Sequence, residues 1–266
     1  MKRACELASN KGESSWLNAI PLKEQNLDLN KEEFNDALRL RYDIPLEGFP
    51  SNCACGERFS INHALSCHKG GFIMMRHNNV RDFFTVMLDK VCVDVECEPH
   101  LLPVMHEIMR LRSAITDNEA RLDIKAKSFW RRGQTAFYDV RITHVNSPTN
   151  AGKTTASVFK EHEQAKKRGY LERVTEIEHG SFTPLVLGTN GGMGEECRKF
   201  ISNLANKLAE KNGDTYANAI TWIRVKLSLE ILRAPLICVR GSRTPFRIRQ
   251  INADDFQLDN IDSNII

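Results

Sequence analysis

Residues 121–141, RLDIKAKSFWRRGQTAFYDVR, hold two segments in which polar and apolar residues alternate, joined by a basic connection that contains a glycine. Alternation with a period of two is typical of half-buried strands, so the pair predicts a β-hairpin. Asp139 and Arg141 then share one face of their strand, because successive side chains point to opposite faces. Asp123 and Lys125 can face them from the partner strand. Two facing carboxylates beside a cation can hold a divalent metal for phosphodiester hydrolysis, and the simpler interpretation is a salt-bridged hairpin.

The segments on either side of this hairpin predict the rest of the fold. Helical spacing of apolar residues predicts a helix after Asn30, which forms a capping box with Glu33, and further helices over 76–92, 158–178, 195–211 and 215–233, the last ending before Pro235. Strands are predicted over 93–102 and 182–187. From residue 76 to 187 the order is helix, strand, strand, strand, helix, strand, which predicts an α/β fold with a mixed sheet flanked by helices.

Charge and composition narrow the class of protein. The 266 residues carry a net charge of +3, but residues 254–266 contain four Asp and no Lys or Arg, so residues 1–253 stand at +7. This asymmetry favours an anionic partner. No apolar run approaches the roughly 20 residues of a membrane span, and the N-terminus is too polar for a signal peptide, so we expect an intracellular protein without a membrane partner. In a reducing compartment its eight cysteines are expected to be thiols or metal ligands.

One group of cysteines has the composition of a metal site. Cys53, Cys55, His63 and Cys67 supply three thiolates and an imidazole within fifteen residues, a set that suits tetrahedral zinc, and His68 can replace a member. The single residue between Cys53 and Cys55 is a tighter spacing than usual. Unliganded or redox-active thiols are the alternative. Four protein ligands leave no open position, so a metal here would be structural.

The order of these motifs resembles the C-terminal region of non-LTR retrotransposon polyproteins that carry a restriction-like endonuclease. In that family a CCHC zinc motif follows the reverse transcriptase, an R-H-N helix comes next, and a PD-(D/E)xK nuclease closes the polyprotein. Here the corresponding segments are the cysteine and histidine group at 53–67, Arg76-His77-Asn78, and the two aspartate segments. The resemblance covers about residues 16–190.

The resemblance implies a role for each matching residue. Cys53, Cys55, His63 and Cys67 would bind zinc. Asp123 and Asp139 would be the two catalytic acids that hold Mg²⁺ or Mn²⁺, and Arg141 stands where the family has its catalytic lysine. Arginine keeps a positive charge for the phosphate but cannot act as a base near neutral pH. Lys166 or Lys167 on the following helix can reach the same site, and Lys125 is a further substitute.

The implied function is metal-dependent endonucleolytic cleavage of DNA, the nick that opens target DNA for retrotransposition, by a detached or fragmentary retroelement C-terminal region. DNA would be the main partner and element RNA a further one, and the nucleus would be the location. The alternative is a zinc-stabilised nucleic-acid-binding module with a degenerate, inactive nuclease site. The expected organisation is an N-terminal segment at 1–50, a zinc lobe at 51–75, a restriction-like nuclease core at 76–194, a helical extension at 195–250 and an acidic, disordered tail at 251–266.

Overall fold

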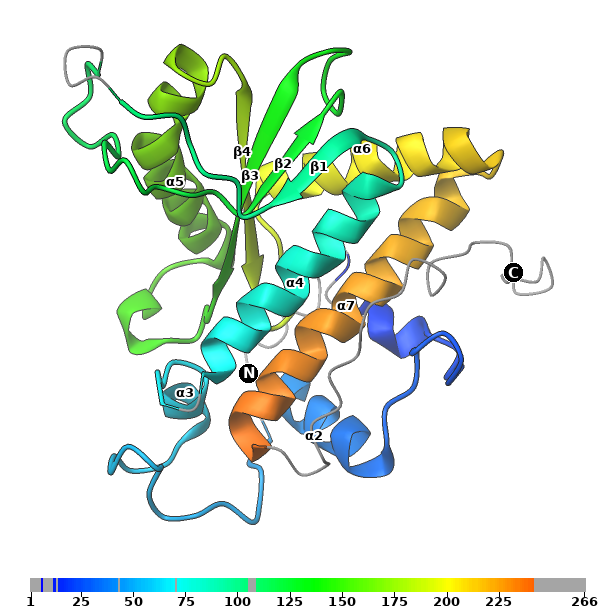
Figure 1. The fold of residues 1–266 in the computed structure, drawn as a ribbon. Helices are drawn as coiled ribbons and strands as arrows, with labels where there is room; N and C mark the ends of the chain where they lie inside the picture. The colour runs from blue at the N-terminus through cyan, green and yellow to red at the C-terminus, as the bar shows by residue number, and fades with distance from the viewer. Residues whose placement is uncertain are drawn as a thin grey trace.

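The computed structural model describes residues 6, 12, 14–42, 44–69, 71–104 and 109–241, so the tail expected at 251–266 lies outside the described residues. The elements of the fold follow one another along the chain as shown in Figure 1. They are η1 (Ser15–Asn18), α2 (Lys31–Tyr42), α3 (Ile61–Ala64), α4 (Phe72–Asp89), β1 (Val93–Cys97), β2 (Ile124–Lys127), β3 (Thr135–Thr143), η2 (Pro148–Asn150), α5 (Thr155–Glu176), β4 (Ser181–Gly188), α6 (Glu195–Asn212) and α7 (Tyr216–Arg240). The predicted order of helices and strands from residue 76 to 187 is confirmed.

The sheet has four strands in the order β1-β2-β3-β4. The first three are antiparallel neighbours, and β2 and β3 form the hairpin that the alternating segments predict. β4 lies parallel to β3, with Asp139 beside Pro184, because α5 carries the chain back across the sheet between the two strands. The fold is therefore mixed α/β.

Helices cover the two faces of this sheet unequally. α4, α6 and α7 lie on one face, and α5 lies alone on the other (Figure 1). The larger core forms on the three-helix side, where Tyr138 of β3 packs edge-on against Phe200 of α6. On the α5 side, Phe137 and Phe182 pack with Val174. The two aromatic residues of β3, which are consecutive, thus face opposite cores, as the alternation predicts.

α7 connects the sheet layer to the N-terminal part of the chain. Its middle packs against Trp16 and the buried residues of α2, and its end packs against Leu65, beside α3. Arg240, the last residue of the helix, makes a two-pronged ion pair with the buried Asp36 of α2, at 2.6 and 2.8 Å. η1, α2 and the segment around α3, which precede the sheet in the sequence, are therefore all packed on one long helix.

Two predicted element ends are wrong by five residues or more. The strand expected over 93–102 ends at Cys97, because Glu98 has a positive φ of 53° and Pro99 has no N–H for a ladder. The helix expected to end before Pro235 continues to Arg240. Proline inside a helix costs roughly 3 kcal/mol, and burial of the last turn of α7 against the lobe around α3 offsets this cost.

Among the helices that the structure describes, none combines the length and the apolar composition needed to cross a bilayer.

Candidate active site and metal centre

The two aspartates meet at the end of the β2–β3 hairpin. Asp139 lies within β3, and Asp123 directly precedes β2, with its N–H donating to the carbonyl of Tyr138 at 3.1 Å. Asp139 is only 5% exposed. Asp123 therefore lies across the hairpin from Asp139, and its charge acts on this buried carboxylate in surroundings that screen it weakly.

Asp139 makes an ion pair with Lys166 of α5, whose Nζ lies 2.7 Å from Asp139 Oδ2. The pKa of Asp139 is raised to about 6, first by burial and also by the charge of Asp123, while Lys166 opposes the shift. Burial of the carboxylate, more than the charge of its neighbours, therefore disfavours the ionised form of Asp139.

Asp123 is held through one oxygen. The N–H of Val140 donates to Asp123 Oδ2 at 2.5 Å, and Nε2 of His77 lies 3.2 Å from the same atom. This contact raises the pKa of His77 above its usual value. Asp123 thus accepts hydrogen bonds from two neighbours through a single oxygen.

Lys166 reaches Asp139 because one stripe of α5 lies along one face of β3. His162 contacts Thr143 at 3.1 Å, Lys166 contacts Asp139, and Val174 packs on Phe137 further along. Residues four apart share a helix face, and residues two apart share a strand face, so the contacts follow from the two periodicities. Lys167 points elsewhere and pairs with Glu196 of α6 at 2.6 Å.

The other two cations considered for the site make no ion pair with Asp139 among the described residues. Arg141 is exposed, and in the described part of the chain it makes no ion pair; the group that its charge affects is His162, whose pKa is lowered to about 4, mainly by burial. Lys125 pairs with Glu96 of β1. Of the four candidate cations, Lys166 is the one that the structure places on an aspartate.

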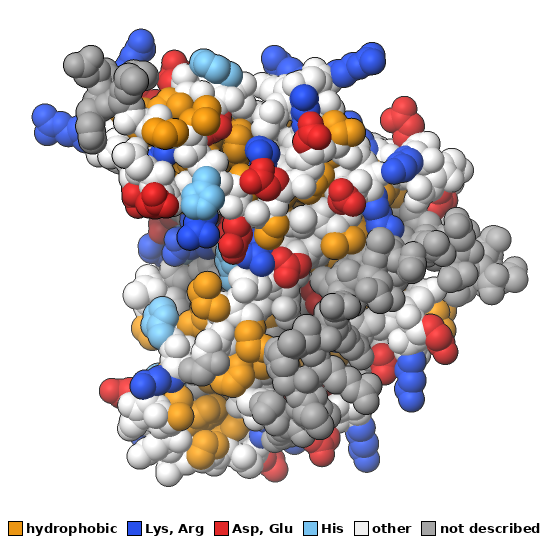
Figure 2. Space-filling model, in the orientation of Figure 1, with side chains coloured by type: hydrophobic (Ala, Val, Ile, Leu, Met, Phe, Trp, Pro, Cys, Tyr) orange, Lys and Arg blue, Asp and Glu red, His pale blue; other side chains and the backbone are white. Residues whose placement is uncertain are grey.

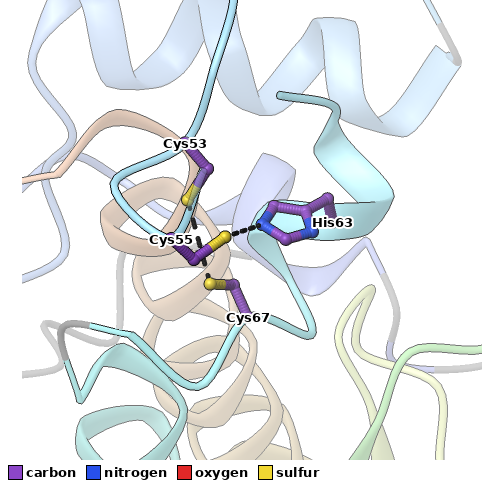
Figure 3. Close-up of side chains that lie close together, drawn as sticks. All are labelled: Cys53, Cys55, His63 and Cys67. Atoms are coloured by element: carbon purple, nitrogen blue, oxygen red, sulfur yellow. Dashed lines mark hydrogen bonds between the residues drawn. The ribbon is translucent and has the colours of Figure 1, made fainter. Parts of the chain in front are cut away.

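The Cys/His cluster is also brought together. A turn closed by the N–H of Cys53 donating to Glu57, with Gly56 at a φ of 96°, presents two of the thiols, and α3 presents His63. Figure 3 shows the three sulfurs and the imidazole pointing at a common centre. All four ligand atoms lie within 4.8 Å of one another.

The distances within the cluster fit tetrahedral zinc. Bonds of about 2.3 Å place two thiolates of a tetrahedron about 3.8 Å apart. The sulfurs of Cys53 and Cys67 are 3.8 Å apart, and Cys55 Sγ lies 3.2 Å from His63 Nε2. The pKa of Cys53 is lowered to about 7, first by the backbone N–H of Cys55 and then by His63, so its thiolate forms near neutral pH. The cluster can bind a metal such as zinc.

Two contacts join the lobe that holds the cluster to α4 and to the end of β3, the elements that carry His77 and Asp139. Arg76, buried in α4, donates to the carbonyl of Leu65 at 3.2 Å, and the next residue in the helix is His77. Asn62 of α3 lies 2.7 Å from Nε2 of His144, directly after β3. Figure 2 shows basic, acidic and histidine side chains gathered across this side of the molecule, between α5 and the first half of α4.

Without a divalent cation, we expect Asp139→Asn to be more stable than the wild type at pH 8, by about 1–3 kcal/mol. The pKa of Asp139 is raised in the folded state, so its contribution to stability is full below its usual value of 3.8 and is lost as pH rises through about 6. Asparagine removes this loss. Urea unfolding of both proteins at pH 4 and pH 8 measures the difference in stability. Asp94→Asn, which changes an exposed acid of β1, is the matched control. If the wild type and Asp139→Asn have equal free energies of unfolding at pH 8, the charged form of Asp139 is not disfavoured in the folded protein, and the prediction is wrong.

The sequence did not indicate the contact of His77 with Asp123, although His77 lies in the R-H-N segment.

A scan of the chain against models of protein families gives no match, and a search of curated proteins gives none either.

Proposed function

We propose that the protein is a metal-dependent DNA endonuclease with a restriction-like core, and that Asp123, Asp139 and Lys166 form its site. The observation that carries the proposal is the 2.7 Å ion pair between Lys166 and the buried Asp139, beside a second carboxylate. Two acids and a lysine within reach of one phosphate are the minimum set for hydrolysis of a phosphodiester assisted by a divalent cation.

The residues present fit Mg²⁺ or Mn²⁺. Both acids offer oxygen ligands, which these ions prefer, and the pKa of Asp139 is raised mainly because its carboxylate is buried. A cation held by Asp123 and Asp139 would stabilise the ionised form of this buried carboxylate. When bound, such an ion lowers the pKa of water and polarises a phosphate.

Lys166 contributes a positive charge that does not depend on the metal. Its ammonium group lies 5.8 Å from the centre of the Tyr170 ring, and Tyr170 stacks at 5.8 Å on Phe182, so an aromatic wall limits where the ammonium can move. A fixed ammonium beside the two acids can neutralise a phosphate oxygen as negative charge develops. Arg141, exposed on the same strand face, is suited to contact the DNA backbone outside the site.

The zinc lobe supports the same proposal. A structural zinc at Cys53, Cys55, His63 and Cys67 would hold a lobe that contacts α7 and the start of α4. A zinc lobe followed by a nuclease is the arrangement that the C-terminal region of non-LTR retrotransposons has, so we assign the chain to that class, with target DNA as substrate, element RNA as a second ligand, and the nucleus as the place of action.

Conversion of supercoiled plasmid to open circles tests this function. With Mg²⁺ or Mn²⁺ the wild type should nick the plasmid, and Asp139→Asn should be slower by about a hundredfold or more because it lacks a charged ligand. Asp94→Asn is the control with unchanged activity, since Asp94 lies exposed on the edge strand β1 and pairs with Lys127 at the other end of β2 from Asp123.

Failure of the wild type to nick any plasmid with either metal would overturn the proposal. If that inactive protein still shifts DNA on a gel, the chain is instead a zinc-stabilised nucleic-acid-binding module whose nuclease site is degenerate.

A further inference from the structure

The first turns of α4 place an imidazole against the first acid of the candidate site. His77 Nε2 lies 3.2 Å from Asp123 Oδ2 and 3.1 Å from the carbonyl oxygen of Val140. A carboxylate and a carbonyl can only accept hydrogen bonds, so Nε2 must carry the hydrogen and donate to both. Nε2 of His77 therefore carries a hydrogen whether the ring is neutral or protonated.

The carboxylate of Asp123 is held from two sides through the same oxygen. Oδ2 accepts from His77 on α4 and from the N–H of Val140 on β3. No donor to Oδ1 is found within the described ranges. Oδ2 of Asp123 thus accepts hydrogen bonds from the protein, and Oδ1 can bind a ligand.

Asp123 needs this support because of its position. It precedes β2 rather than lying within the strand, and its charge opposes ionisation of Asp139. Without hydrogen bonds to Oδ2, repulsion between the two acids would favour rotation of the Asp123 side chain away from Asp139.

The donor itself is firmly placed. Arg76, the residue before His77, is buried, and its Nη1 donates to the carbonyl of Leu65 at 3.2 Å. The helix that carries His77 is therefore fixed at its first turns against the lobe around α3.

We propose that His77 is a positioning residue for Asp123, whose Nε2–H holds Oδ2 and leaves Oδ1 as the oxygen that takes the divalent cation; this role rests on the proposed nuclease function. His77 does not contact the metal or the phosphate. Its effect acts through Asp123, as the residues behind metal ligands commonly do.

The test compares two variants of the zinc-loaded protein. His77→Leu keeps the volume and loses the donor, whereas His77→Gln keeps an N–H at similar reach. Mn²⁺ affinity, measured by electron paramagnetic resonance of the free ion, should fall about 10- to 100-fold in the leucine variant and return to within about threefold of the wild type in the glutamine variant. His100→Leu, at an exposed histidine outside the site, should leave it unchanged. In nicking assays at varied Mg²⁺ concentration, the concentration that gives the half-maximal rate should be highest for His77→Leu and close to the wild-type value for His77→Gln.

The outcomes separate this inference from the function it rests on. Wild-type affinity for Mn²⁺ in a folded His77→Leu protein, or equal loss in the leucine and glutamine variants, overturns the role of His77 even if plasmid is nicked. The expected order of Mn²⁺ affinities in a protein that never nicks DNA supports the role of His77 and overturns the function. A wild type that binds Mn²⁺ no better than Asp139→Asn overturns both.

Discussion

Replacing Cys67 by serine is expected to lower the free energy of unfolding by about 3 kcal/mol or more, since a hundredfold loss of metal affinity removes about 2.7 kcal/mol at saturating zinc. Cys67 is one of four ligands whose atoms lie within 4.8 Å of one another. Serine keeps the size of the side chain and removes the soft thiolate that zinc prefers.

The loss should extend beyond the lobe. The apolar residues around α3 pack on the end of α7, and Leu65 and Asn62 bond to Arg76 and His144. Since Arg76 is followed directly by His77, release of the metal should also weaken Mn²⁺ binding at the carboxylate site. A small lobe with little core of its own depends on its metal for folding.

Three measurements test this prediction: zinc content by mass spectrometry, thermal unfolding, and limited proteolysis of residues 51–69. Cys97→Ser is the matched control, because Cys97 is an exposed, free thiol on β1. A Cys67→Ser protein with a full equivalent of zinc and the unfolding temperature of the wild type would contradict the assignment of the cluster.

Lys166→Ala is expected to slow nicking by about 10²–10³-fold, the usual cost of losing a fixed charge that stabilises a transition state. The Nζ of Lys166 lies 2.7 Å from Asp139, and this lysine also neutralises that buried acid. Arg141→Ala should cost less than about tenfold, mainly through weaker DNA binding, because a surface charge contributes to backbone contacts rather than to chemistry.

Lys167→Ala is the matched control for this comparison, since Lys167 is adjacent in sequence and pairs with Glu196 instead. Single-turnover nicking rates at saturating protein separate the chemical step from DNA binding. If Arg141→Ala abolishes nicking and Lys166→Ala does not, the arginine completes the site, as the strand motif alone implies.

Local signals were sufficient to predict much of the framework. The alternation at 121–141 predicted the antiparallel β2–β3 pair, and the helix expected over 195–211 ends at Asn212, before the left-handed Gly213 with its φ of 68°. The spacing of the cysteines predicted the cluster, because its ligands lie within fifteen residues and a short turn suffices to gather them.

The choice among the lysines depends on how α5 lies on the sheet. Lys166 and Lys167 differ by about 100° around a helix, so one can face β3 while the other faces α6. A signal was present in the sequence: His162, Lys166, Tyr170 and Val174 recur every four residues, which marks one face of a helix. Sequence alone does not say which strand residue lies under that face.

The contact of His77 with Asp123 could not be predicted from the sequence, because the two residues are 46 positions apart and no local pattern joins them. The course of α7 through Pro235 was unpredictable for a related reason. Local propensity ends a helix at proline, and only the burial of the following turn against a distant lobe outweighs it.

The central claim is that Asp123 and Asp139 together hold one divalent cation. The most direct measurement is anomalous diffraction from crystals of the zinc-loaded protein soaked in Mn²⁺. The account predicts a manganese peak bonded to a carboxylate oxygen of each aspartate, at about 2.1–2.3 Å, that disappears in Asp139→Asn. A fully soaked crystal with no manganese between these two residues would contradict the account.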